Sequence, residues 1–368
     1  MTLARLRRAI FAAICAMVLT ISSTSVSTLG SEAVHAATPT PFRAFRADSW
    51  WNSVVPARAP SHADFETILS YLRTAEQNGG GFLRLAGAGK SRWGQPIFWS
   101  ERGDREYRVV KTRYALPREF SRLRIPAPAR PGDNSDAELV IYDRDRGYVA
   151  LLWRAAYNAR TDTWSAGGGS VAYLDSNGLH AAWAASDDPR NTGSFRGNSG
   201  ATVAVRYDEV TAGAIEHVLK IAAGPEVSTR AVFPLIRSDG DDPASPVKQG
   251  LRLRIKPSVN LKSLRLHPQA LVIARAIKRY GVYVGDSAGV TALKLEDTRV
   301  HGRGQLWTLP VDALSQLPFT PEIWQVLPDG YKPSIEPDAI SPDEAVQVGT
   351  GSGRLVAQAP SGACNPTG

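Results

Sequence analysis

Two groups of acidic side chains have the residue types and the spacing that polysaccharide chemistry requires. Asp239, Asp241 and Asp242 follow an apolar segment in FPLIRSDGDD, and Glu296 and Asp297 end the segment TALKLED. Most glycoside hydrolases place two carboxylates on either side of the bond that they break, one as the acid and one as the base or nucleophile. Asp239 and Glu296 are therefore our first candidates for the catalytic pair.

The three clustered aspartates allow two other interpretations. Carboxylates are ligands that calcium prefers, so a calcium ion held by Asp239, Asp241 and Asp242 is one alternative, although the spacing fits no EF-hand. Asp-Gly pairs also form ordinary turns. We expect no other cofactor.

A histidine inside an apolar segment is the third catalytic candidate. If IEHVLKI is a strand, His217 shares a face with Ile215 and Leu219. It then lies either in the core or on the floor of a cleft, where an imidazole acts as a base or orients a carboxylate. A helix fits the same segment, but the preceding Gly213 and the short length favour a strand.

Two serine motifs resemble those of hydrolases but lack their context. The segment RGNSG around Ser199 resembles the nucleophile turn of trypsin-like proteases, and GDSAG around Ser287 resembles an esterase motif. The catalytic histidine and aspartate that should precede Ser199 are missing in suitable positions. A nucleophile elbow joins a strand to a helix, whereas VTALKLED after Ser287 alternates like a strand. We expect both to be turns, with a trypsin-like protease as a less favoured alternative.

A long polar connection separates two apolar segments between residues 173 and 200. Long ordered connections are often functional, and sugar sites combine aromatic faces with hydrogen-bonding side chains. A surface loop closed by turns is the alternative. The predicted substrate-binding residues are Trp50, Trp51, Asn177, His180, Trp183 and Arg196.

The elements that must position these residues are mostly strands. Short β-branched or alternating segments such as ELVIYD, GYVALLWRA, GSVAYLD, ATVAVRY and LRLRIKP are separated by turn residues. The spacing predicts a mainly β fold, an antiparallel jelly-roll-like β-sandwich. Apolar periodicity predicts helices near 61–76 and 268–280, and a short third helix near 312–317, giving two or three flanking helices.

The two ends of the chain differ from its middle. Arginines, an apolar run and a small-residue exit predict a signal peptide over 1–36. A linker or entering arm over 37–47, a single domain over 48–332 and a disordered tail over 333–368 follow. Only Cys364 remains after cleavage, and no membrane span is expected because a span needs about 20 apolar residues. We expect a secreted, extracellular monomer.

The charge is positive but spread along the chain. The formal net charge is +8, and removal of three arginines and one glutamate with residues 1–36 leaves +6. A positive field suits anionic cell-wall polymers or acidic sugars, but a solvated surface on an arginine-rich protein is the favoured explanation. We expect no nucleic-acid partner, because no signature of such a protein is present.

Several segments are similar to a family of secreted bacterial proteins for which no function is known to us. These segments are DSWWNSVVP, SNGLHAAW, NTGSFRGNSGATVAV, FPLIRSDGDD, GLRLRIKPS and IARAIKRYGVYVGDSAG. The resemblance covers nearly all of the chain after the signal peptide. It implies an exported location and carries no catalytic residues.

Together these features favour a secreted carbohydrate-active enzyme, a glycoside hydrolase acting on an extracellular polysaccharide or cell-wall glycan. A non-catalytic module that binds cell walls or glycans is the alternative. A polysaccharide lyase is less favoured.

Overall fold

The computed structural model describes residues 41–74, 80–192, 194–224 and 226–333 of this chain. The predicted signal peptide, residues 37–40 of the arm and the tail beyond Pro333, with Cys364, lie outside these residues. No helix in the part of the chain that the structure describes has the length and apolar character needed to cross a membrane.

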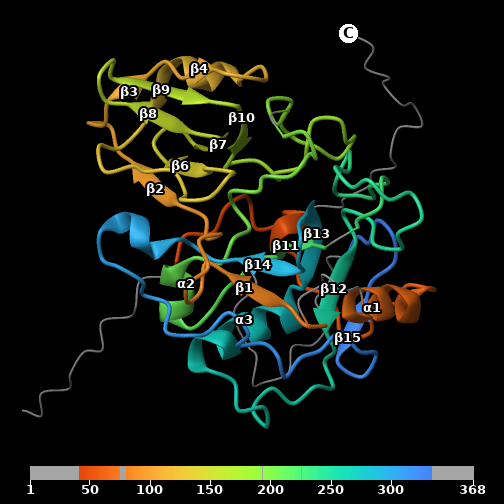
Figure 1. Cartoon of the computed structure of the whole chain (residues 1–368). Helices are drawn as coiled ribbons and strands as arrows, with labels where there is room; N and C mark the ends of the chain where they lie inside the picture. The colour runs from red at the N-terminus through yellow and green to blue at the C-terminus, as the bar shows by residue number, and fades with distance from the viewer. Residues whose placement is uncertain (1–40, 75–79, 193, 225, 334–368) are drawn as a thin grey trace, which may run out of the picture. The chain divides into compact units, whose positions relative to one another are not determined.

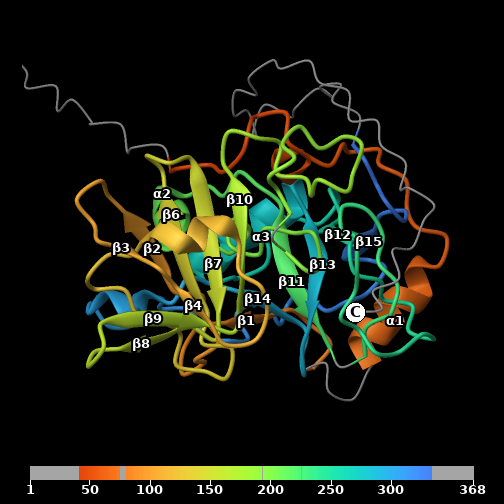
Figure 2. The same cartoon turned by 90° about the horizontal axis from the view of Figure 1, so that it is seen from above.

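A six-stranded mixed sheet lies between a layer of helices and a second sheet (Figure 1). Its strand order is β1-β14-β11-β13-β12-β15. Strands β11, β13 and β12 run side by side in Figure 2. The strands are β1 (Arg84–Ala86), β11 (Leu219–Ala223), β12 (Arg252–Ile255), β13 (Val282–Ser287), β14 (Ala292–Lys294) and β15 (Trp324–Val326).

Helices cover one face of this sheet because their apolar sides pack on its aliphatic residues. Helix α1 (Phe65–Thr74) buries Ile68, Leu69 and Leu72, and helix α3 (Pro268–Arg279) buries five residues in the same core. Both lie within the ranges that apolar periodicity predicts. Proline at the first position fits the start of α3, and Gly281 follows its end with φ of 77°.

A four-stranded sheet lies against the other face, in the order β10-β7-β6-β2. An aromatic core that includes Trp50, Trp51 and Tyr283 fills the space between the two sheets. A second core on the far side of the four-stranded sheet is centred on Phe120. The strands are β2 (Ile97–Ser100), β6 (Leu139–Asp143), β7 (Tyr148–Trp153) and β10 (Gly168–Tyr173).

Smaller elements extend this second layer. Strands β3 (Glu106–Tyr107) and β5 (Leu123–Arg124) form one pair, and β4 (Val110–Lys111), β8 (Ala156–Asn158) and β9 (Thr163–Ala166) form a three-stranded sheet. Three short 3₁₀ helices lie at Trp50–Asn52, Arg118–Arg122 and Thr298–His301.

The prediction of a mainly β fold is confirmed, whereas a jelly roll is not. The sheets are mixed rather than purely antiparallel, since β1 pairs with β14, β11 with β13 and β2 with β6 in parallel. The segment YDRDRGY forms the hairpin connection that joins β6 to β7. The prediction that GDSAG is a turn is wrong, because Gly285, Asp286 and Ser287 belong to β13, and β11 lies between β13 and β14.

One predicted strand is irregular. In ATVAVRY, residues 201–205 are buried but form only an isolated bridge at Val205, and helix α2 (Tyr207–Ala212) begins where the segment ends. The apolar alternation of this segment reflects its burial between two cores. The segment does not pair with a neighbouring strand along its length.

Candidate functional site

A β-bulge directs a carboxylate onto the polar side of the six-stranded sheet. In the pairing of β11 with β13, Ile221 lies opposite Val284, but Ala222 lies opposite Asp286, so Gly285 is the extra residue. A bulge changes the direction in which the following side chain points and is common next to active sites. Asp286 therefore points toward the side of the sheet that carries Lys220.

Lys220 approaches Asp286 across the bulge. The Lys220 side chain is almost fully buried, and its Nζ is 3.3 Å from Oδ2 of Asp286. A β-carbon at position 285 would lie 2.5 Å from Cγ of Lys220. The lysine stem thus occupies the space that a side chain at Gly285 would need, which explains why this position is a glycine.

Arg196 binds two carboxylates at once. Its Nη2 is 2.7 Å from Oδ1 of Asp286, and its Nη1 is 2.8 Å from Oδ2 of Asp239. Its Nε donates to the carbonyl of Gly285 at 3.0 Å. Asp239 also accepts a hydrogen bond from the side-chain amide of Gln249. Asp239 and Asp286 are therefore separated by one guanidinium group.

A second ion pair joins the two sheets beside the first. Nζ of Lys294, on β14, is 2.6 Å from Oε2 of Glu138, which directly precedes β6. We use the name charged cluster for the three cations Arg196, Lys220 and Lys294 and the three carboxylates Glu138, Asp239 and Asp286. Its formal charge is zero, and positive and negative groups alternate within it.

The electrostatics of the charged cluster keep Asp286 ionised. Burial raises the pKa of Asp286, but Lys220, Arg196 and Lys294 outweigh burial and bring it to about 2. For Glu138, burial likewise raises the pKa, and the positive charges of Lys294 and Lys220 lower it further than burial raises it.

The two lysines respond in opposite directions. Burial lowers the pKa of Lys220, and Asp286 only partly offsets this effect. Burial also lowers the pKa of Lys294, but the charge of Glu138 outweighs it and the pKa is raised. Lys220 therefore releases its proton at a lower pH than Lys294 does, which is the behaviour expected of a lysine that acts as a base.

The turn around Ser199 supports the charged cluster rather than a nucleophile. Gly197 has φ of 84°, and the turn brings Nδ2 of Asn198 to 3.0 Å from the hydroxyl of Tyr283. Ser199 is buried. None of the histidines within the described ranges hydrogen-bonds to it; their ring nitrogens contact other groups. Ser287 ends strand β13, and no helix follows it directly.

The predicted tryptophans do not line a cleft. Trp50, Trp51 and Trp183 are 0%, 1% and 6% exposed and belong to the core between the sheets. Their indole N–H groups donate to backbone carbonyls, as that of Trp183 does to Pro234 at 2.9 Å. The prediction that these rings stack on sugars is wrong, because packing between the two sheets covers their faces.

Asn177 and His180 stabilise the loop in which they lie. The Asn177 side chain donates to the carbonyl of Ala185 and accepts from the amide of Leu179. Nδ1 of His180 accepts from the amide of Ala182. Burial lowers the pKa of His180. Of the six predicted substrate-binding residues, only Arg196 lies in the charged cluster.

His217 is buried away from the charged cluster. Strand β11 begins at Leu219, so His217 lies in the preceding bend and not on the strand. Its Nε2 is 3.0 Å from Oε1 of Glu209, an ion-pair distance without hydrogen-bond geometry. Glu209 is buried as well. A catalytic role for His217 has no geometric support, because its ring does not reach solvent.

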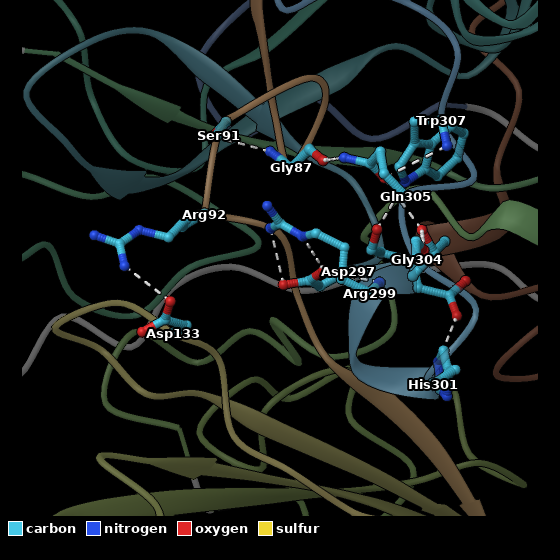
Figure 3. Close-up of polar contacts among 12 residues, drawn as sticks. Gly87, Ser91, Arg92, Asp133, Asp297, Arg299, His301, Gly304, Gln305 and Trp307 are labelled. Carbon is cyan, nitrogen blue, oxygen red and sulfur yellow. Dashed lines mark hydrogen bonds and ion pairs between the residues drawn. The ribbon is translucent and has the colours of Figure 1, made fainter.

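Glu296 lies in a separate polar group after β14. Its Oε1 is 3.2 Å from Nε2 of His301, and its Oε2 accepts from the amide of Tyr207 at 2.8 Å. Figure 3 shows the neighbouring contacts, including Arg299 against Asp297. Asp239 contacts Arg196 and Gln249 and has no contact with Glu296. The structure therefore does not support these two as a catalytic pair.

The three aspartates of the calcium alternative do not converge. Asp239 turns to Arg196, and Asp242 accepts from the amide of Ala244. Across the described residues, no three side chains of His, Cys, Asp or Glu are grouped so as to hold a metal ion.

Four members of the charged cluster were not predicted from the sequence: Glu138, Lys220, Asp286 and Lys294. Both lysines interrupt apolar strand segments, in VLKIAA and in TALKLED. A charged residue within a buried strand needs a partner, so this interruption was the available signal. Asp286 carries no such signal, because it lies in the polar segment GDSAG.

No protein-family model, curated protein or solved structure matches this chain. The resemblance to secreted bacterial proteins therefore stays a prediction, and the site rests on its geometry alone.

Proposed function

We propose that this chain is a secreted enzyme that hydrolyses glycosidic bonds in an extracellular polysaccharide, with the charged cluster as its active centre. The observation that carries the proposal is the pair Asp239 and Asp286 on either side of Arg196. Their side chains are 31% and 16% exposed, so solvent reaches both. Grouped ionisable residues with strongly shifted pKa values are typical of active sites.

The two carboxylates suit different roles. Asp286 has a pKa of about 2, so it stays ionised and serves as the nucleophile or base rather than as the acid. Asp239 then serves as the acid, in place of Glu296. Arg196 binds both carboxylates and would fix their positions relative to one another.

Digestion of a polysaccharide panel tests this proposal. The chain from Ala37 onward would be incubated with plant, fungal and bacterial cell-wall polysaccharides, and new reducing ends would be measured. We expect Asp286→Asn and Asp239→Asn each to lower the rate at least about 100-fold, the usual minimum for loss of an acid or base. Asp241→Asn is the matched control, because Asp241 lies in the same loop, is exposed and has no side-chain contact in the structure.

The outcomes separate an enzyme from a binding module. The proposal is supported if both variants lose turnover but still co-sediment with the polysaccharide. Turnover that survives in both variants would overturn the assignment of the site. Co-sedimentation with an insoluble wall fraction and no turnover across the panel would favour a non-catalytic glycan-binding module.

Lys220 favours a polysaccharide lyase as the second candidate. A lyase needs a base that removes a proton from the sugar ring, and burial lowers the pKa of Lys220. Such an enzyme produces unsaturated uronates, which absorb ultraviolet light. The lyase is favoured over the hydrolase if the intact chain forms products with this absorbance and the Lys220→Met variant does not.

A further inference from the structure

Two aromatic rings stack at the end of β7 and lie close to two arginines. The rings of Tyr114 and Trp153 have centroids 6.2 Å apart and an interplanar angle of 27°. Tyr114 is 53% exposed. The guanidinium carbon of Arg113 lies 4.9 Å and 5.9 Å from the two ring centres, and that of Arg154 lies 4.5 Å from the Trp153 ring. We call these four residues the aromatic-arginine patch.

The arginines of this patch lack acidic partners. Neither Arg113 nor Arg154 forms an ion pair or a side-chain hydrogen bond with any residue in the described ranges. Other arginines on aromatic rings in this layer are neutralised, as Arg105 is by Asp162 and Arg190 is by Asp188. The patch therefore presents two uncompensated positive charges beside the exposed aromatic side chain of Tyr114.

A cavity of about 570 Å³ begins next to the patch. Its lining includes Ala115 and Gly169 at one end and Arg118 and Arg190 among its charged residues. Ala115 directly follows Tyr114 in the chain. A β-carbon at Gly168 would lie 3.4 Å from the Tyr114 ring, and the next residue, Gly169, lines the cavity.

The patch also adjoins the charged cluster. Nε1 of Trp153 donates to Oδ1 of Asp136 at 3.3 Å. Two residues further along the chain, Glu138 binds Lys294 of the charged cluster. A polymer bound at the charged cluster therefore has an aromatic and cationic surface within reach on the second sheet.

We infer that the aromatic-arginine patch binds the acidic sugar units of a polysaccharide that carries carboxylate groups. An exposed aromatic face packs against the apolar face of a sugar ring, and the planar guanidinium group binds a carboxylate through two parallel hydrogen bonds. The inference rests on the proposed function in one respect, namely that the ligand is a polysaccharide. It specifies the class of polysaccharide, which is a polyuronate.

Affinity for polygalacturonate and for its fully methyl-esterified form tests the inference. Esterification removes the charge and leaves the sugar chain in place. We expect the intact chain to bind the acidic form at least tenfold more tightly, with affinity that falls as salt is added. The double variant Arg113→Ala/Arg154→Ala should lose at least tenfold in affinity, and Tyr114→Ala should lose three- to tenfold.

A charge-matched control is available on the same part of the surface. Arg108 and Arg160 are exposed, and their side chains form no hydrogen bond, ion pair or ring contact in the structure, so Arg108→Ala/Arg160→Ala removes the same charge from outside the patch. It should change affinity less than twofold. Equal loss in both double variants, or equal affinity for the esterified polymer, would overturn the inference. Dextran sulfate that binds as tightly as polygalacturonate would overturn the assignment to carboxylates.

The binding experiment and the turnover experiment can refute the two proposals separately. Asp286→Asn should lose turnover but keep the tenfold preference for polygalacturonate over its methyl-esterified form. Selective binding without turnover in the intact chain would contradict the proposed enzyme and keep the patch. Turnover of neutral polysaccharides without selective binding of the acidic polymer would support the proposed enzyme and overturn the inference about the patch.

Discussion

The side chain of Lys220 fills the space beside Gly285 that a β-carbon at position 285 would need. The lysine stem passes over the bulge, and a β-carbon at position 285 would stand 2.5 Å from its Cγ and 2.6 Å from Cε2 of Tyr283. The bulge at Gly285 also sets the direction of Asp286. One backbone irregularity thus positions both partners of a buried ion pair.

Replacing this glycine should disturb the charged cluster. We expect Gly285→Ala to destabilise the fold by about 1–3 kcal/mol, the usual cost of overpacking a core, and to lower any turnover by displacing Lys220. Denaturant unfolding measures the first effect. Gly289→Ala is the control, because a β-carbon there meets nothing within 4 Å. Stability for Gly285→Ala equal to that of the control would contradict the close contact.

Acid should destabilise the chain through Asp286. Its pKa is lowered from 3.8 to about 2 in the folded state. Because a lowered carboxyl pKa stabilises the fold above the unfolded value, this contribution is complete above about pH 4 and is lost as the pH falls to about 2. The difference corresponds to about 2 kcal/mol. Unfolding free energies across this range should fall less steeply for Asp286→Asn.

A surface carboxylate provides the comparison for that titration. Asp145 also has a pKa of about 2, because it accepts hydrogen bonds from Arg102 and Arg124, but it lies on the surface. High salt should therefore suppress the effect of Asp145→Asn and leave most of the effect of Asp286→Asn, since buried pairs are screened less. Equal salt sensitivity of the two variants would show that Asp286 is not buried among its cations.

Trp183 should matter for stability and not for binding. The change Trp183→Phe removes the hydrogen bond to the carbonyl of Pro234 and part of the packing on Phe233. We expect a loss of about 1–2 kcal/mol in unfolding free energy and an affinity for polysaccharide within twofold of the original. A tenfold loss of affinity in a fully folded Trp183→Phe variant would restore this ring to the binding site.

Ser199 should not react as a serine nucleophile. It is 7% exposed, and the histidines in the described ranges bind elsewhere. A fluorophosphonate probe should leave the chain unlabelled under conditions that label trypsin fully. Labelling that Ser199→Ala abolishes would contradict the assignment of RGNSG to a turn.

The amino-acid sequence by itself determined features that depend on neighbours along the chain. The apolar faces of α1 and α3 follow from a 3.6-residue period, and most strands follow from alternation. The turn around Ser199 follows from its glycines and from the missing context of a nucleophile, whereas Ser287 belongs to strand β13. These signals are local, so they survive without knowledge of what packs against them.

The tertiary structure decided which polar residues meet. Arg196, Asp239 and Asp286 lie far apart in the sequence, and only the loop geometry and the order of the strands bring them together. A bulge reverses the face that simple alternation would assign to Asp286. Likewise, the sequence predicts Trp50 and Trp51 as binding residues, whereas the second sheet buries them in the core. Long-range pairing and burial by another layer leave no local mark on the sequence, which is why the site had to be located in the fold.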